Sequence, residues 1–194
     1  MAQLRLRRGV VAPQLPPLWD VPSLSGHLVE ISAHGGSSAL TLACGLIAQA
    51  QLAAEPTAWI TSPANSFFPV DAHASGIDLH ALVTVRIPEH AMARVADHLV
   101  RSGAFGLIII DLGLAHDIPM ALLSRLAAAA QTYESAIIFL TNKHSQASSL
   151  GSLIAVRGQA QHRAHSDGEF LCDIEIIKDK RRGPGWHHTE ACYG

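Results

Sequence analysis

The chain has 194 residues, of which 48% are hydrophobic and 15% are charged, and its formal net charge is -2. This composition is typical of one folded domain with a sizeable core and excludes a largely disordered chain. The charge excludes a globally basic nucleic-acid-binding protein, and no apolar run reaches the roughly 18 residues that a membrane span needs.

The first 25 residues are predicted to be a basic, proline-rich arm, and residues 26–194 a single core domain. Arg5, Arg7 and Arg8 precede four prolines, which disfavour regular helix. A solvated leader is the simplest interpretation, and an arm that contacts DNA or a partner is the alternative.

Short apolar runs alternate with helical patterns between residues 28 and 141. Strands are predicted at 28–32, 57–61, 82–86, 106–112 and 135–141. Helices are predicted at 38–54, at 88–103 and after Asp117, whose carboxylate is expected to cap its helix. The alternation predicts a right-handed, mostly parallel sheet with helices on both faces.

The segment 88–103 has the pattern of an amphipathic helix. Pro88 suits its first turn and Gly103 its end. Arg94 and Arg101 are expected to face solvent. The expected inner face comprises Ala91, Met92, Val95, Ala96, Leu99 and Val100.

Three later segments, 153–165, 168–180 and 186–194, alternate apolar and polar residues with a period of two. This period is typical of strands, and the short turns between the segments predict antiparallel pairing at one edge of the sheet. The predicted fold class is therefore α/β, a mostly parallel sheet with flanking helices and an antiparallel C-terminal edge. In such sheets ligands bind beyond the carboxyl ends of the parallel strands.

The loop after the first strand has the outline of a phosphate-binding loop but lacks its chemistry. A working loop reads G-x-x-x-x-G-K-[ST], where the lysine neutralises phosphate and the hydroxyl binds Mg²⁺. Ala39 stands at the lysine position and Leu40 at the hydroxyl position. The sequence therefore predicts no ATP hydrolysis and no cofactor, although Gly35 and Gly36 leave weak anion binding as an alternative. Asp111 is expected to cap a loop.

Several stretches, LVEI, TLACGLIAQAQ, AWI, LVRSGAFGLIIIDL and DIEIIKDKRRGP, resemble the ATPase core of the bacterial recombinase RecA over residues 22–194. The tract FFPVDAHASGIDLHALVTVR is similar to the ImuA family, also described as SulA-related, whose members are RecA-like proteins of SOS mutagenesis cassettes. The characteristic spacing is carried by Pro69, Ala72, Gly76, Asp78 and Leu82. The resemblance implies a RecA-like fold and an accessory role in error-prone translesion synthesis. The implied partners are RecA, an ImuB-like Y-family polymerase relative and, indirectly, an error-prone C-family DNA polymerase.

The resemblance also indicates a partner-binding surface. Lys178 and Lys180 match a lysine pair that, in RecA, reaches across the filament interface toward the neighbour's ATP. Two residues apart on a strand, they are expected on one face, and Arg181 and Arg182 extend the patch. An edge strand that uses charge against aggregation is the alternative. Phe68 is a further candidate, as an exposed anchor for a partner.

Direct DNA binding is expected to be weak or absent. The stretch TNKHSQASSLGS after Leu140 offers only Lys143 and His144 as basic candidates, and DNA affinity depends mainly on contacts between cations and phosphates. No metal site is predicted either, because His187 and His188 would face opposite sides of a strand.

The N-terminus lacks a secretory signal, and three scattered cysteines predict reduced thiols in the cytoplasm. Three functions follow from these observations. The first is a non-catalytic RecA-like adaptor in SOS-induced translesion synthesis, nucleoid-associated through its partners. The second is a residual ATP-dependent, DNA-binding, recombinase-like enzyme. The third is a SulA-type cell-division inhibitor.

Overall fold

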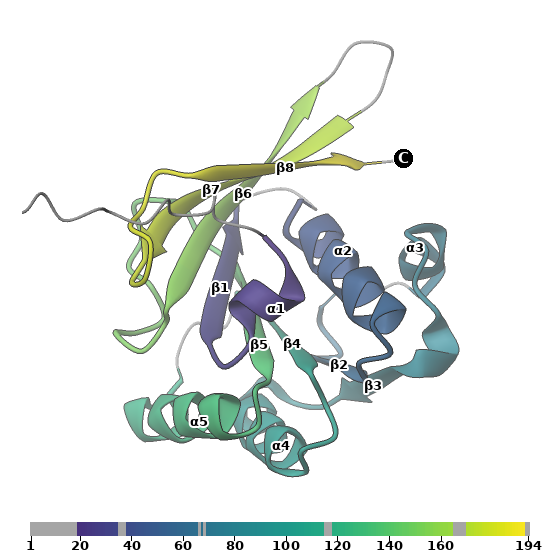
Figure 1. The fold of residues 1–194 in the computed structure, drawn as a ribbon, viewed down its shortest axis with the longest axis vertical. Helices are drawn as coiled ribbons and strands as arrows, with labels where there is room; N and C mark the ends of the chain where they lie inside the picture. Colours follow the sequence, from purple (N-terminus) through teal and green to yellow (C-terminus); the bar gives the residue numbers. More distant parts are fainter. Residues whose placement is uncertain are drawn as a thin grey trace, which may run out of the picture.

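A computed structural model describes residues 19–34, 38–65, 67, 69–114, 118–164 and 170–192. Its eight strands form one sheet in the order β3-β2-β4-β5-β1-β6-β7-β8 (Figure 1). The strands are β1 (Leu28–Ala33), β2 (Thr57–Thr61), β3 (Leu82–Arg86), β4 (Leu107–Gly113), β5 (Ala136–Asn142), β6 (Val156–Ala164), β7 (Phe170–Asp179) and β8 (His187–Cys192). The predicted partner anchor Phe68, and most of the predicted arm, lie outside the described residues.

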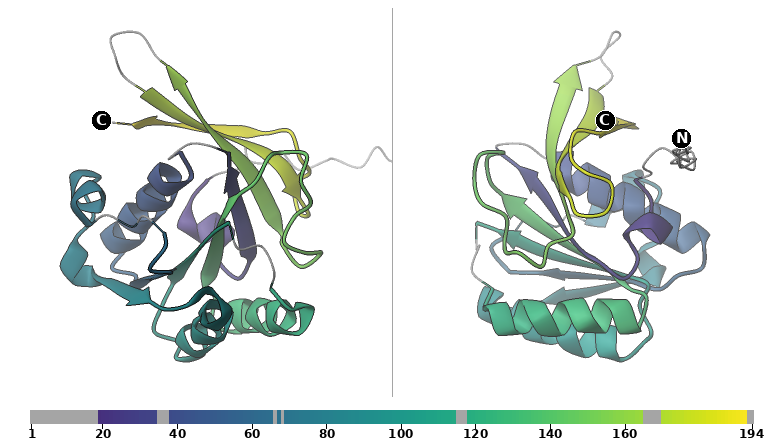
Figure 2. Two further views of the ribbon diagram at one scale, coloured as in Figure 1. Left: turned by 180° about the vertical axis from the view of Figure 1, so that it is seen from behind. Right: turned by 60° about the vertical axis from the view of Figure 1, so that its left-hand side comes forward.

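The sheet is parallel from β3 through β6 and antiparallel from β6 to β8. The predicted fold class is therefore confirmed. Strand β6 has two roles, because it lies parallel to β1 on one side and antiparallel to β7 on the other. It thereby joins the parallel strands to the C-terminal antiparallel strands, whose buried side chains on β7 share a core cluster with α2 (Figure 2).

Helices cover both faces of the parallel strands. They are α1 (Val21–Leu24), α2 (Ser38–Leu52), α3 (Pro69–Ala74), α4 (Glu89–Arg101) and α5 (Met120–Thr132), with a 3-10 turn η1 (Leu79–Ala81). Helices α1 and α2 lie on one face of the sheet, and α4 and α5 lie on the other (Figures 1 and 2). The helices α1 and α3 were not predicted.

Two hydrophobic layers explain why the central strands are apolar without alternation. In β4, Leu107 and Ile109 point into the layer beneath α2, whereas Ile108 and Ile110 point into the layer beneath α4 and α5. All four side chains are fully buried. Because both faces of the strand are covered, both sets of alternate residues must be hydrophobic.

The inner face of α4 differs in part from the prediction. Met92, Ala96 and Val100 are buried as expected, and so is Asp97. The other three predicted inner residues, Ala91, Val95 and Leu99, are only half-buried. The reason is tertiary: α5 packs against the opposite flank of α4 and buries Asp97, so the helix is rotated relative to the apolar stripe that its sequence suggests.

The chain packs against the core from Trp19 onward, within the segment predicted to be an arm. Trp19, Val21 and Leu24 are buried. Asp20 caps α1, because its Oδ1 accepts a hydrogen bond of 2.8 Å from the Ser23 N–H. Pro22 did not prevent this helix, because proline is tolerated in a first turn, where the N–H groups have no partner within the helix.

The cysteines differ from one another. Cys44 is a buried cysteine outside any disulfide, whereas Cys172 is disulfide-bonded. The expectation of reduced thiols throughout is therefore wrong for Cys172, because spacing along the chain does not report the distances that strand pairing sets. In the described part of the chain, no helix combines the length and apolar composition of a membrane span.

Candidate functional site

A cavity of about 370 Å³ opens at the carboxyl ends of β1, β4 and β5, beside the first residues of α2. This is the position at which open parallel sheets bind ligands, and it is where the sequence predicts the altered phosphate loop. The described lining residues are Ala33, Ala39, Leu40, Ala64, Asn65, Asp111, Gly113, Leu114, Leu140, Thr141 and Asn142. Gly35 and Gly36 lie outside the described residues.

Asp111 is the one ionisable group among these described lining residues, and none of them is basic. Ala39 and Leu40, which occupy the lysine and hydroxyl positions of a working loop, contribute methyl and isobutyl groups to the wall instead. The described part of the wall therefore offers a phosphate group no positively charged side chain. Placing a phosphate beside a buried carboxylate would add repulsion.

Asp111 holds two strand ends together. Its side chain is buried, and its Oδ2 accepts a hydrogen bond of 3.2 Å from the Thr61 hydroxyl on β2. The Asn65 amide donates to the Asp111 backbone carbonyl at 2.6 Å. Burial raises the pKa of Asp111, and the hydrogen bonds from Thr61, Gly113 and Asn65 offset this only in part. These contacts match the predicted loop-capping role.

A second buried carboxylate, Glu30 on β1, lies in a network of polar groups. Lys143 Nζ lies 2.9 Å from its Oε1, and the Leu150 N–H donates to its Oε2 at 2.9 Å. The Arg157 guanidinium lies 3.9 Å from Oε2, and the Thr141 hydroxyl donates to Oε1 at 3.1 Å. Burial alone would raise the pKa of Glu30, but these donors and cations outweigh it and lower the pKa.

This network fixes the loop between β5 and β6, where the sequence offered its few candidates for DNA contact. Arg157 donates to the backbone carbonyls of His144, at 3.0 Å, and of Ala147. Lys143 is buried against Glu30, so its charge is already neutralised. His144 is exposed and stacks on His34, with ring centroids 3.5 Å apart. Of the two predicted cations, Lys143 is therefore structural.

Lys178 and Lys180 lie at the end of β7 and just beyond it. Lys178 is half-buried, and its Nζ donates to the Gly151 carbonyl at 3.2 Å. Burial and the nearby charge of Lys180 lower the pKa of Lys178, and the negative charge of Glu30 opposes this shift. Lys180 is exposed, and its backbone N–H donates to the Ala155 carbonyl at 3.0 Å. The structure thus brings the two lysines close enough to repel each other.

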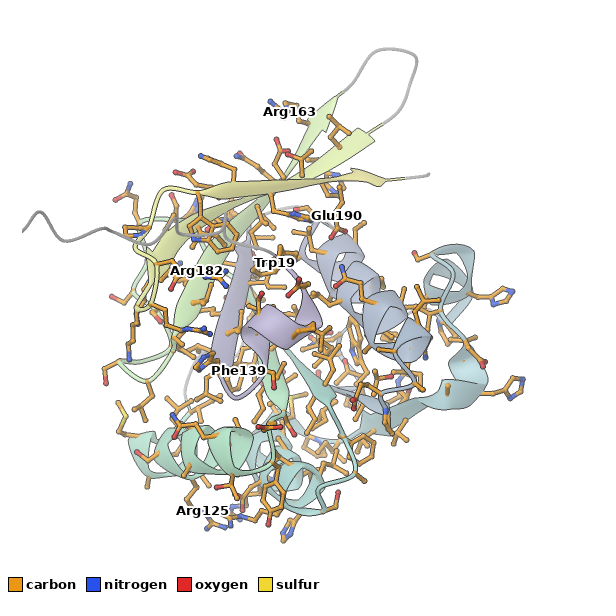
Figure 3. All side chains as sticks on the ribbon, in the orientation of Figure 1. Trp19, Arg125, Phe139, Arg163, Arg182 and Glu190 are labelled. Atoms are coloured by element: carbon orange, nitrogen blue, oxygen red, sulfur yellow. The ribbon has the colours of Figure 1, made fainter. Side chains whose placement is uncertain are left out.

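Arg181 points in a different direction from Lys178. Its Nη1 donates to the Ser23 carbonyl at 3.3 Å and lies 2.9 Å from His27 Nε2. Arg182 is exposed (Figure 3), and the backbone N–H groups of both arginines donate to the Asp179 carboxylate. Asp179 thus holds the turn, and Arg181 binds the N-terminal segment. The four predicted residues do not form a single flat patch.

Sequence reasoning missed Glu30, Arg157 and Asp179. Glu30 had a visible signal, because it is the only charged residue in the apolar run LVEISA, and a charge in a covered strand requires a partner. Its partners lie more than 100 residues away along the chain, so nothing local identifies them. In the described part of the chain, no three His, Cys, Asp or Glu side chains are placed to hold a metal ion.

The fold and this cavity together define a class of protein, an α/β domain with a mostly parallel sheet and a cavity at the carboxyl ends of β1, β4 and β5. The chain is 38% identical over 88 residues to the protein RecA of Fusobacterium nucleatum. That match covers 44% of this chain and 23% of the relative, so the chain spans only about a quarter of that RecA. No protein-family profile matches the sequence. The similarity supports a RecA-like relationship.

Proposed function

We propose that this protein is a non-catalytic, RecA-like adaptor in SOS-induced, error-prone translesion DNA synthesis. The observation that supports this most strongly is the cavity at the nucleotide position, whose described wall has a buried carboxylate and no cation. A RecA-like domain that cannot neutralise phosphate can still act through its shape, as a surface that binds other proteins. We infer that this shape binds RecA, an ImuB-like polymerase relative, or both, with the C-family polymerase recruited indirectly.

The proposed contact with RecA is the end of β7. Lys180 is exposed and Lys178 is half-buried beside it, so Lys180 is the group best placed to meet an acidic partner. Arg182 adds an exposed side chain on the same turn. Arg181 supports this surface indirectly, because it anchors the turn to the residues around α1.

The experiment is a calorimetric titration of the protein with RecA, with and without a non-hydrolysable ATP analogue. We expect saturable binding to RecA, and no saturable heat when the analogue is added to this protein alone. Lys180→Glu should weaken binding to RecA about tenfold, because it replaces an attraction with a repulsion at the contact. Arg163→Glu is the matched control, since Arg163 is exposed and pairs with Asp173 elsewhere on the C-terminal strands.

Saturable binding of the analogue by this protein alone would contradict the adaptor and favour the residual ATP-dependent enzyme. Absence of RecA binding, with binding to the bacterial division-ring protein instead, would favour the cell-division inhibitor. Equal weakening by Lys180→Glu and Arg163→Glu would remove the end of β7 as the contact while leaving the adaptor function standing.

A further inference from the structure

The outer surface of α4 carries a row of cationic and imidazole side chains. His90, Arg94 and His98 follow one another at four-residue spacing, so they form one ridge with steps of about 6 Å along the helix. All three side chains are exposed. Within the part of the chain that the structure describes, none of the three forms an ion pair. The ridge is therefore open to an external partner.

A second ridge lies directly beside the first and is apolar. Ala91, Val95 and Leu99 have the same four-residue spacing, shifted by one residue. All three side chains are half-buried, and Val95 and Leu99 also pack against the core. The part of each side chain that stays exposed is the part that a partner can contact. A second helix can pack on adjacent ridges with this spacing, because its own side chains fit into the groove between them.

The flank toward α5 adds further guanidinium groups. Asp97, which is buried, accepts from Arg101 Nε at 2.9 Å and from Arg125 Nη2. Arg101 and Arg125 keep 44% and 58% of their side-chain surface exposed, so both retain N–H groups that face solvent. Arg125 projects from the side of α5 that faces away from the sheet (Figure 3). One carboxylate thus orients two arginines along the same surface.

We propose that the outer face of α4 binds an acidic amphipathic helix of a protein partner. Carboxylates at four-residue spacing on that helix meet Arg94 and the two histidines, and its apolar ridge covers Val95 and Leu99. Arginine favours carboxylate through paired N–H donors, and the half-buried ridge supplies apolar area that a phosphate backbone cannot use. Two of the surface arginines already share Asp97, so the net charge is too small for tight binding of a polyanion.

This surface is carried by elements other than β7, so it is independent of the proposed RecA contact. The probe is a fluorescent helical peptide with glutamates at every fourth position and leucines on the adjacent ridge. Fluorescence anisotropy with the full chain should show saturable binding that a peptide of scrambled order lacks. Failure of this binding, with RecA binding intact, would overturn the inference and leave the proposed function unaffected.

The variant Arg94→Glu/His98→Glu should weaken peptide binding about tenfold, since both side chains are exposed and two contacts become repulsive. The control Arg163→Glu should bind as the wild type does. A peptide with lysine in place of the glutamate that faces position 94 should bind the double variant more tightly than it binds the wild type. That rescue distinguishes a direct contact from a loss of folding.

Two further results would refute the proposal. One is equal loss of binding in Arg94→Glu/His98→Glu and Arg163→Glu, which would show only a general charge effect. The other is tighter binding of a short single-stranded oligonucleotide than of the acidic peptide at the same ionic strength, with loss in the double variant. The face of α4 would then be a nucleic-acid site.

Discussion

Glu30 and Asp111 are both buried carboxylates, on strands of one sheet that are separated only by β5. Their pKa values nevertheless shift in opposite directions. Burial raises the pKa of Asp111, whose side-chain hydrogen bonds come from neutral donors. Burial acts on Glu30 too, but Leu150, Lys143 and Arg157 reverse its effect. The difference teaches that the donors around a buried carboxylate, here a backbone N–H and two cations at Glu30, decide whether its pKa is raised or lowered.

The two carboxylates also differ in the cations that surround them. Lys143 and Arg157 have become part of the fold, where they hold the loop between β5 and β6 against Glu30. The cavity beside Asp111 has none among its described lining residues. A carboxylate with its cations stabilises structure, whereas a carboxylate without them repels phosphate.

The largest expected effect comes from Lys143→Met, which breaks the Glu30 network. Removing one partner of a buried ion pair leaves an uncompensated charge and should lower the free energy of unfolding by about 3 kcal/mol at pH 7. Urea unfolding monitored by circular dichroism measures the change. Lys180→Met is the matched control, because Lys180 is exposed, and it should stay within about 0.5 kcal/mol of the wild type.

The effect of Lys143→Met should shrink at low pH. The lowered pKa of Glu30 contributes stability that is present above its ordinary value of 4.5 and is lost as pH falls through the folded-state pKa. In the variant Glu30 loses its main cation, so less stability remains to be lost. A difference in the free energy of unfolding between variant and wild type that stays constant from pH 7 to pH 3 would contradict the role assigned to Lys143.

Asp111→Asn should change the pH dependence of stability in the opposite direction. Because the folded state raises the pKa of Asp111, the wild type loses stability as pH rises from the ordinary aspartate value of 3.8 through the folded-state pKa. The variant lacks this loss, so its free energy of unfolding should rise by about 1 kcal/mol relative to that of the wild type between pH 4 and pH 7. Unfolding curves at matched pH values measure the difference. A relative loss over that range would show that Asp111 is stabilised as an anion.

The smallest effect is expected from Leu114→Lys, which supplies the missing cation. Leu114 lines the cavity and is 77% exposed, so the substitution leaves the core intact. The new ammonium group should lower the pKa of Asp111, as Lys143 does for Glu30, and the exposed pair should add no more than about 0.5 kcal/mol of stability. Carboxyl-carbon NMR titration measures the pKa. An unchanged pKa would mean that solvent screens the cavity entrance.

The sequence by itself determined the fold class, because its evidence is local. Unbroken apolar runs such as 107–110 predict strands covered on both faces, and the period-two segments after residue 153 predict the antiparallel edge. It also predicts the loss of phosphate-binding chemistry, because Ala39 and Leu40 are identities at fixed positions that no packing can change. Lys178 and Lys180 were expected on one face of a strand, but β7 ends at Asp179, so Lys180 lies in the turn that follows.

Only the tertiary structure decided which charges remain available. Glu30 lies on β1, Lys143 just after β5 and Arg157 on β6, and nothing local indicates that they neutralise one another. The structure likewise turned Arg181 toward α1 and rotated α4, leaving Val95 and Leu99 accessible. Periodicity reports which residues share a face of an element. The direction of that face, and the partner of a buried charge, depend on contacts between segments far apart in the chain.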